Sequence, residues 1–335
     1  MNSPSAIQVE IIHNEGKGTW KGDSTHKIRL TTELEIGIAE GDETLMLGRV
    51  SDIAVDEDLN IYIVDDGFKR VQKYDSAGDL LLTFGRSGPG PGEFRQPWAI
   101  AVDEKQQIYV GDRDDVIVFD SEGRCVSQFD VDIPGGFIRG VEIEAKTGRI
   151  FVACASVVGQ KAIHVYDHNH KRLNSFCDVF GGRDEFDARI RDTFAGGDID
   201  MDGKGLVFYT QMTPYEIRVF SVNGTIRRRI FRDDEDMRAP EIQMSEHGTS
   251  MKPGTTSLSI VVLEDNKFIN VLGNPTGQNG TMEIAIDLFN SAGELLLSQR
   301  VGKSLFPKCS DNNGRVYVID MDDYPKVLRC QIVYD

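Results

Sequence analysis

An internal repeat constrains the fold of this chain more than any other feature of its sequence. The segment SDIAVDEDLNIYIVDD, residues 51–66, aligns without a gap with WAIAVDEKQQIYVGDR, residues 98–113, and the two start 47 positions apart. Each continues into a third apolar stretch and a glycine-containing turn, RVQKYDSAGDLLLTFG (70–85) and DVIVFDSEGRCVSQFD (115–130). Self-similarity at a fixed period of this length indicates a repeat architecture.

Weaker copies extend the repeat to six units. They are RGVEIEAKTGRIFVACA with AIHVYDHNHKRLNSF, GGDIDMDGKGLVFYTQ with EIRVFSVNGTIRRRIF, SIVVLEDNKFINVLG with MEIAIDLFNSAGELLLSQ, and CSDNNGRVYVIDMDD with CQIVYD. Each unit contains four short apolar stretches separated by Asp, Asn and Gly turns, which is typical of β-strands. We therefore predict an all-β, six-bladed β-propeller of four-stranded blades. Residues 26–335 form one propeller domain in this interpretation, and residues 1–25 are an N-terminal arm.

The chain ends predict how the ring closes. The C-terminal IVYD aligns with QKYD at 72–75, which belongs to the third strand of a blade, so the last blade lacks its outer strand. The segment HKIRLTTELEIGI (26–38) alternates as a strand does and precedes the first repeat. We expect it to complete the last blade, because joining the first and last strands in one sheet removes an exposed edge. The arm before it is expected to lie across one rim.

The glycine- and proline-rich run SGPGPGEF lies where one blade must connect to the next. Glycine permits left-handed backbone and proline prevents continued strand pairing, so the run is expected to act as a crossover. Phe94 and Trp98 are expected to anchor it. A phosphate-binding loop is disfavoured, because the run precedes a strand and not a helix.

The second unit, GPGEFRQPWAIAVDEKQQIYVGDRDDVIVFDSEG, resembles an NHL repeat. The whole chain, from about residue 28 to 335, resembles the six-bladed propellers that carry NHL-like blades. The resemblance implies the fold and little about function, since this fold hosts lyases, lactonases, receptors and scaffolds.

Composition excludes several classes of partner. The formal net charge is -17, which disfavours nucleic acid and anionic membrane surfaces, because both are bound through Lys and Arg. No apolar run approaches the length of a membrane span and no signal peptide is visible. The compartment is left open, and an exported origin is compatible if the sequence is trimmed. We expect a monomer. The five cysteines form no C-x-x-C pair and are expected to be reduced thiols.

The mouth of the central channel is the expected binding site. Aligned repeats place six residues at equivalent entry positions of the inner strands: Ser51, Trp98, Arg139, Ala195, Leu258 and Phe306. Asp65, Asp112 and Asp320 occupy an equivalent end of the second strand. The predicted binding residues are Asp52, Trp98, Asp112, Arg113, Arg139, Phe194 and Phe306. The alternative is structural: the aspartates bond turn amides, Trp98 wedges two blades and Arg139 neutralises Glu142.

No catalytic residue is predicted. Streptogramin and amidated-peptide lyases resemble this fold and use channel histidines, but none of the six histidines here falls on an expected inner strand. Glu142 and Asp198 were aligned with the small residues Ala54, Ala101 and Cys309, where acids are costly to bury. A divalent cation such as calcium near Glu142 and Asp198 is one explanation, and a salt bridge to an arginine is the other.

The sequence thus favours a propeller that binds a small molecule, peptide or protein at the channel mouth, with no cofactor. The rival hypothesis is a metal-dependent hydrolase or lyase acting in the channel. Two long excursions, residues 181–197 and 233–254, are expected to lie on one rim and help cover the mouth. The first has helical spacing at Phe186, Ile190 and Phe194.

Overall fold

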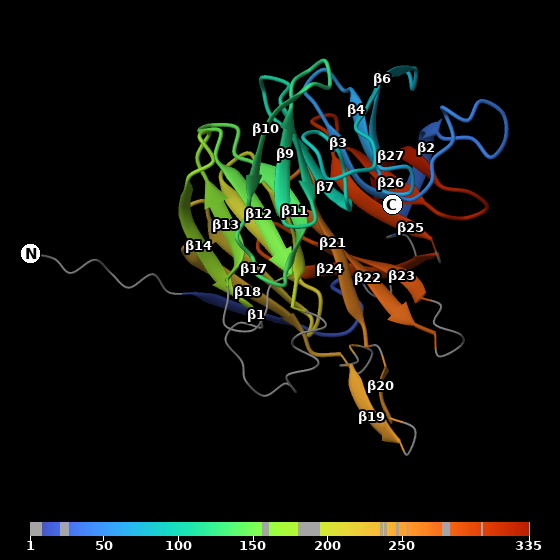
Figure 1. The fold of residues 1–335 in the computed structure, drawn as a ribbon. Helices are drawn as coiled ribbons and strands as arrows, with labels where there is room; N and C mark the ends of the chain where they lie inside the picture. Colours follow the sequence, from blue (N-terminus) through green and yellow to red (C-terminus); the bar gives the residue numbers. More distant parts are fainter. Residues whose placement is uncertain are drawn as a thin grey trace, which may run out of the picture.

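The computed structural model describes most of the chain and consists of β-strands arranged as a ring of sheets (Figure 1). The described residues are 9–20, 27–155, 161–179, 195–234, 237, 240–245, 248–252, 254–276, 282–302 and 304–334. Among them, no helix is long and apolar enough to cross a membrane. Six sheets form the ring, five with four strands and one with a fifth strand added at its outer edge, so the predicted six-bladed β-propeller is confirmed.

The first three blades follow one another along the chain, each antiparallel and numbered from its inner strand outward. They contain β3 (Val50–Val55), β4 (Ile61–Asp65), β5 (Arg70–Tyr74) and β6 (Leu80–Phe84); β7 (Pro97–Val102), β8 (Ile108–Asp112), β9 (Asp115–Phe119) and β10 (Cys125–Asp130); and β11 (Phe137–Ile143), β12 (Ile150–Ala155), β13 (Lys161–Tyr166) and β14 (Arg172–Asp178).

The last three blades have the same order. They contain β15 (Gly197–Met201), β16 (Leu206–Gln211), β17 (Glu216–Ser221) and β18 (Ile226–Arg232); β21 (Thr256–Val262), β22 (Phe268–Pro275), β23 (Met282–Phe289) and β24 (Leu295–Gly302); and β25 (Leu305–Ser310), β26 (Arg315–Asp320), β27 (Lys326–Tyr334) and β2 (Ile28–Ile36). Each inner strand contacts the inner strands of both neighbouring blades, and β25 contacts β3, so the ring is closed around a central channel.

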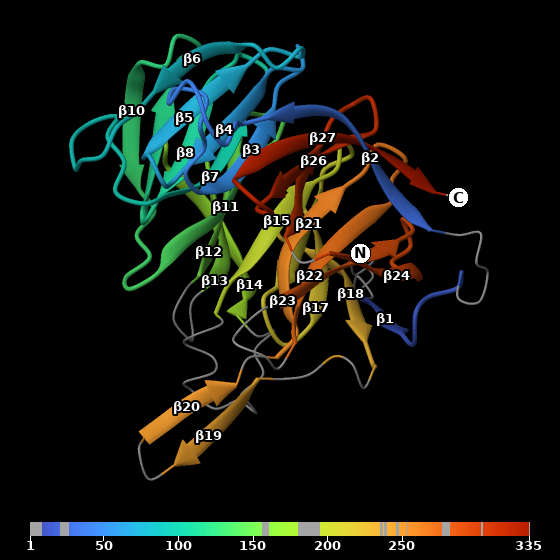
Figure 2. The same ribbon diagram turned by 90° about the vertical axis from the view of Figure 1, so that its right-hand side faces the viewer.

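Blade 6 is closed by the N-terminal strand, as predicted. Strand β2 pairs antiparallel with β27, from Ile28 opposite Tyr334 to Ile36 opposite Val327. Ile28 and Ile36 are both buried. Strands β2 (blue) and β27 (red) lie side by side in both views (Figure 2). The two ends of the propeller are thereby held in one sheet.

The described part of the N-terminal arm, residues 9–20, lies on the outside of the ring and not across a rim. Strand β1 (Glu10–Asn14) pairs parallel with β18 and gives blade 4 a fifth strand. The chain then reaches blade 5, where the amide of Trp20 donates to the carbonyl of Leu296 at 2.9 Å. Outer strands offer unpaired amides and carbonyls, which explains why the arm pairs there.

The blades are held together by apolar side chains packed between neighbouring sheets. The middle strands are buried on both faces, as in β4 and β8, where every residue is buried. At the crossover from blade 1 to blade 2, Phe94 is fully buried, and its ring lies 5.7 Å from that of Phe119. Trp98 does not share this role, because it faces the channel mouth. All five cysteines are unpaired, as expected.

The two long excursions are only partly described. Residues 180–194, with Phe186, Ile190 and Phe194, lie outside the described residues, and so does the expected helical segment. In the second excursion, β19 (Glu241–Ser245) and β20 (Gly248–Lys252) form a hairpin. The hairpin stands away from the blades in both views (Figures 1 and 2).

Candidate functional site at the channel mouth

The central channel contains two cavities that follow one another along its axis. The mouth cavity, of about 230 Å³, lies at the start of the inner strands. The inner chamber, of about 540 Å³, lies further along the same strands. Asp198 and Lys308 line both, so the two cavities are consecutive sections of one channel.

Bulges in the inner strands build the mouth cavity. In five inner strands the pairing register shifts near the strand start, and one extra residue is left without a partner opposite it. A bulge redirects the side chain of such a residue. All five of these residues line the mouth cavity: Ser51, Trp98, Arg139, Leu258 and Lys308.

The expected ring of entry residues is therefore mostly assembled. Ser51, Trp98, Arg139, Leu258 and Phe306 line the mouth cavity, whereas Ala195 is buried elsewhere. The other lining residues are Arg49, Val50, Asp198, Ser259, Lys308, Ile319 and Met321. None of the described residues of the 233–254 excursion lines this cavity.

Arg139 lies against aromatic rings at this site. Its guanidinium carbon is 5.1 Å from the centre of the Trp98 ring and 5.5 Å from that of Phe137. No hydrogen bond or ion pair joins Arg139 to any part of the chain that the structure describes, so the expected neutralisation of Glu142 is not seen. Burial lowers the pKa of Arg139, and the nearby Asp198 carboxylate partly offsets this. Arg139 is thus a partly buried cation, and its N–H groups have no hydrogen-bond acceptor among the described residues.

Cations outnumber acids in the lining of the mouth cavity, although the protein is acidic. Three cations and one acid line it: Arg49 (which is paired with Asp66), Arg139, Lys308 and Asp198. The chain as a whole carries a formal charge of -17. A partly buried cavity lined mainly by cations favours an anionic ligand.

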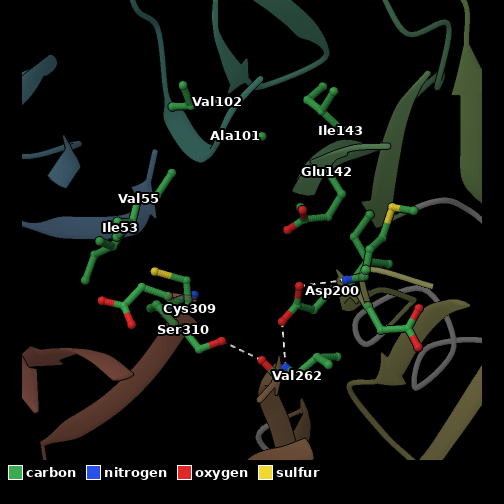
Figure 3. Close-up of a pocket in the computed structure, with 18 of the residues that line it drawn as sticks. Ile53, Val55, Ala101, Val102, Glu142, Ile143, Asp200, Val262, Cys309 and Ser310 are labelled. Carbon is green, nitrogen blue, oxygen red and sulfur yellow. Dashed lines mark hydrogen bonds between the residues drawn. The ribbon is translucent and has the colours of Figure 1, made fainter. Parts of the chain in front are cut away.

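The inner chamber is acidic. Asp52, Asp198 and Asp200 each accept a hydrogen bond from a backbone amide of the next inner strand: Ile100 at 2.9 Å, Ile260 at 3.4 Å and Val262 at 2.7 Å. Glu142 and Asp200 project toward one another from neighbouring strands (Figure 3). Lys308 Nζ lies 4.0 Å from Asp52 Oδ1.

The alignment that placed Asp198 beside Glu142 was wrong by two residues. Asp200 pairs with Phe208 as Ala54 pairs with Tyr62 and Glu142 with Phe151, whereas Asp198 is equivalent to Asp52. Strand β15 has no bulge and starts with Gly197, so no side chain marks its entry position. An alignment of the repeats that starts at the turn between the first and second strands, and not at the strand start, would have placed Asp200 at this position.

Burial and mutual repulsion perturb the chamber acids. Burial raises the pKa of Asp52 to about 7 and that of Asp200 to about 7, and the neighbouring carboxylates add to both shifts. The pKa of Glu142 is also raised well above its usual value, first by burial and then by the Asp200 carboxylate. Burial thus shifts these acids toward the neutral form.

Replacement of Asp200 by Asn is expected to stabilise the protein at high pH. A carboxyl whose folded pKa is about 7 binds its proton more tightly in the folded state than in the unfolded state, where the value is 3.8. Its contribution to stability is therefore lost as the pH rises toward 7. The Asp200→Asn variant should gain on the order of 2 kcal/mol over the wild type at pH 8. The gain should shrink as the pH falls from 7 to 4, which urea unfolding at several pH values measures; a pH-independent difference would contradict it.

Three of the remaining predicted site residues are described, and they lie away from the mouth cavity. Asp112 is buried and accepts hydrogen bonds from the amides of Arg95 and Gln96, and Asp65 binds the amides of Gly48 and Arg49 in the same way. Both brace the connection that enters their blade. Arg113 is exposed in the turn after β8 and lines neither channel cavity. Asp52 lines the inner chamber, and Phe194 lies outside the described residues.

Among the described residues, no three His, Cys, Asp or Glu side chains are grouped so that they could hold a metal ion. The described histidines line neither channel cavity; His164, for example, is buried in blade 3 with its Nδ1 2.7 Å from Ser175 Oγ. A cation near Glu142 and Asp198 therefore stays a prediction.

Known proteins resemble this architecture. A family model described as a 6-bladed beta-propeller, DUF5128, matches residues 40–140. Protein lin-41 of Caenorhabditis elegans is 39% identical over 64 residues, which are 18% of this chain and 6% of lin-41. The match thus spans only a small part of that relative's length. The fold of this chain is an NHL-like six-bladed β-propeller.

Solved structures agree with this propeller along nearly its whole length. A member of the duf4221 family from Bacteroides vulgatus has a TM-score of 0.64 at 11% identity, covering 93% of this chain and 99% of that chain. A gluconolactonase from Xanthomonas campestris has a TM-score of 0.54 at 13% identity and covers 94% of each chain. At such identities the likeness of this NHL-like propeller to either protein concerns the fold alone.

Proposed function

We propose that this propeller binds an organic anion with an apolar body, a small molecule or a peptide, at the channel mouth. The observation that carries the proposal is Arg139, held against Trp98 with no acceptor among the described residues. A guanidinium can bind a carboxylate through two parallel hydrogen bonds, and an aromatic face offers apolar contact at little entropic cost. Phe306 and Leu258 extend the apolar wall.

Binding of 3-phenylpropionate is expected to change the fluorescence of Trp98. The chain has two tryptophans, so a Trp20→Phe background leaves Trp98 as the only one. In that background, Arg139→Met should weaken binding about tenfold or more, since the variant keeps the apolar stem and loses the charge-assisted hydrogen bonds. Titration followed by fluorescence measures this.

Arg113→Met is the matched control, because it removes an exposed arginine that lines neither channel cavity. It should leave the affinity unchanged. Equal affinity in the folded Arg139→Met variant and the wild type would place the binding site elsewhere.

A second candidate is a hydrolase or lyase acting in the channel with a divalent cation. The acidic inner chamber favours it, because carboxylate oxygens are the preferred ligands of calcium. Metal analysis of the purified protein, and its melting curve with and without EDTA, separate this candidate from simple binding. A bound cation should raise the melting temperature, and the chelator should remove that gain.

A further inference from the structure

Three charged side chains meet at the base of the mouth cavity and form no ion pair with one another within the described residues, although Lys308 also lies 4.0 Å from Asp52. Arg139, Lys308 and Asp198 all line it. Asp198 forms no ion pair with either cation within the described residues, and the hydrogen bond that it accepts from the amide of Ile260 is long at 3.4 Å. Burial raises the pKa of Asp198, and the attraction of Lys308 and Arg139 partly offsets this. The base of the cavity therefore offers hydrogen-bond donors on Arg139 and Lys308 and an acceptor on Asp198.

The walls above this base are apolar and the space is small. Trp98, Phe306 and Leu258 face the cavity with Ile319 and Met321. A volume of about 230 Å³ is below the ~300–1,000 Å³ of common small-molecule sites. The cavity thus has room for one compact apolar group beside its polar base.

We propose that the mouth cavity binds an apolar amino-acid unit with a free carboxylate, either a free amino acid or the last residue of a peptide. This inference rests on the proposed function and adds the class of ligand. The apolar side chain lies on Trp98 and Phe306, the carboxylate accepts hydrogen bonds from Arg139 and Lys308, and the ligand nitrogen donates to Asp198. Both an ammonium group and a peptide N–H can donate in this way.

Asp198 is the residue that sets this specificity. A plain carboxylic acid brings an anion next to Asp198 and no donor for it, so the two negative charges repel. An amino acid carries its nitrogen donor one carbon from the carboxylate. Its carboxylate can therefore bind Arg139 and Lys308 while its nitrogen binds Asp198. The sequence around Asp198 gives no hint of this role, because only the closed ring brings Asp198 into one cavity with Arg139 and Lys308.

The test compares three probes that share a phenyl group, in the background where Trp98 is the only tryptophan. L-Phenylalanine is expected to bind about tenfold or more tightly than 3-phenylpropionate, which lacks the nitrogen, and than L-phenylalaninamide, which lacks the carboxylate. In Asp198→Asn the ratio of the affinities for L-phenylalanine and 3-phenylpropionate should fall to about one. Asp202→Asn is the control, since Asp202 lies outside the mouth cavity and binds the turn amides of Lys204 and Leu206. It should preserve the ratio.

The outcomes separate this inference from the proposed function. Equal binding of L-phenylalanine and 3-phenylpropionate by the wild type, or an unchanged ratio in Asp198→Asn, overturns the amino-acid class and leaves anion binding standing. Binding of L-phenylalaninamide as tight as that of L-phenylalanine also overturns it. Absence of binding by both carboxylates overturns both proposals. Glycyl-L-phenylalanine distinguishes the two sources: tighter binding than L-phenylalanine identifies a peptide end, and weaker binding identifies a free amino acid.

Discussion

Removal of residues 1–36 is expected to abolish cooperative folding of the propeller. The deletion takes away β2 and with it the antiparallel pairing to β27 that joins the two ends of the ring. Burial of Ile28 and Ile36 contributes about 1.5–3 kcal/mol each, and each backbone hydrogen bond adds about 1 kcal/mol. The sum is on the order of 5–10 kcal/mol, comparable with the whole stability of a typical protein. Circular dichroism during heating should show no sharp transition.

A shorter truncation serves as the control. Deletion of residues 1–20 removes β1 and the arm but keeps the closing strand, so this variant should still melt cooperatively at a lower temperature. A synthetic peptide of residues 21–40 should restore a sharp transition to the longer truncation. A melting curve unchanged by the deletion of residues 1–36 would show that β2 does not hold the ring together.

Replacement of Gly85 by Ala is expected to destabilise the protein by about 3–4 kcal/mol. Gly85 has a φ of +80°, which costs other residues roughly 1–2 kcal/mol. An added Cβ would also lie 2.1 Å from Cε2 of the fully buried Phe94. Overpacking of that kind typically costs about 1–3 kcal/mol. Urea unfolding measures the change.

Two other glycines separate these contributions. Gly148 has a φ of +68° and no atom within 4 Å of an added Cβ, so Gly148→Ala should cost only the roughly 1–2 kcal/mol of backbone strain. Gly203 also has open space and no left-handed φ, so Gly203→Ala should be close to neutral. If Gly85→Ala costs no more than Gly148→Ala, the Phe94 contact does not limit the crossover.

Most of the fold could be read from the sequence because each blade is a local unit. Short apolar stretches and Asp, Asn and Gly turns specify hairpins between neighbours in the chain. The period of 47 residues between the first two units then specifies that such sheets repeat. Even the long-range pairing of β2 with β27 followed from counting strands, since one blade had three and one strand was left over.

The course of the N-terminal arm could not be predicted in this way. Residues 10–14 carry no repeat signal, and their partner β18 lies more than 200 positions away. Several outer edges are available in a propeller, and only the packing of the assembled ring decides which of them is used. Ile12 and Trp20 join the apolar clusters beside blades 4 and 5, which explains the choice.

The candidate site, too, could be predicted from the sequence only in part. Trp98, Arg139 and Phe306 were found from the sequence because equivalent positions of aligned repeats meet at one end of the channel. Lys308 was missed because the bulge in β25 changes which side chain faces the channel while leaving the apolar pattern nearly unchanged. Asp198 was assigned to the position that Asp200 holds because β15 has no bulge and its entry position is a glycine, so the start of the strand gave no reference for the alignment. The sequence by itself thus determined the blades, their number and the closure, all of which depend on local strand patterns. Only the tertiary structure decided which charges face one another across the channel, because the bulges and the ring set those side-chain directions together.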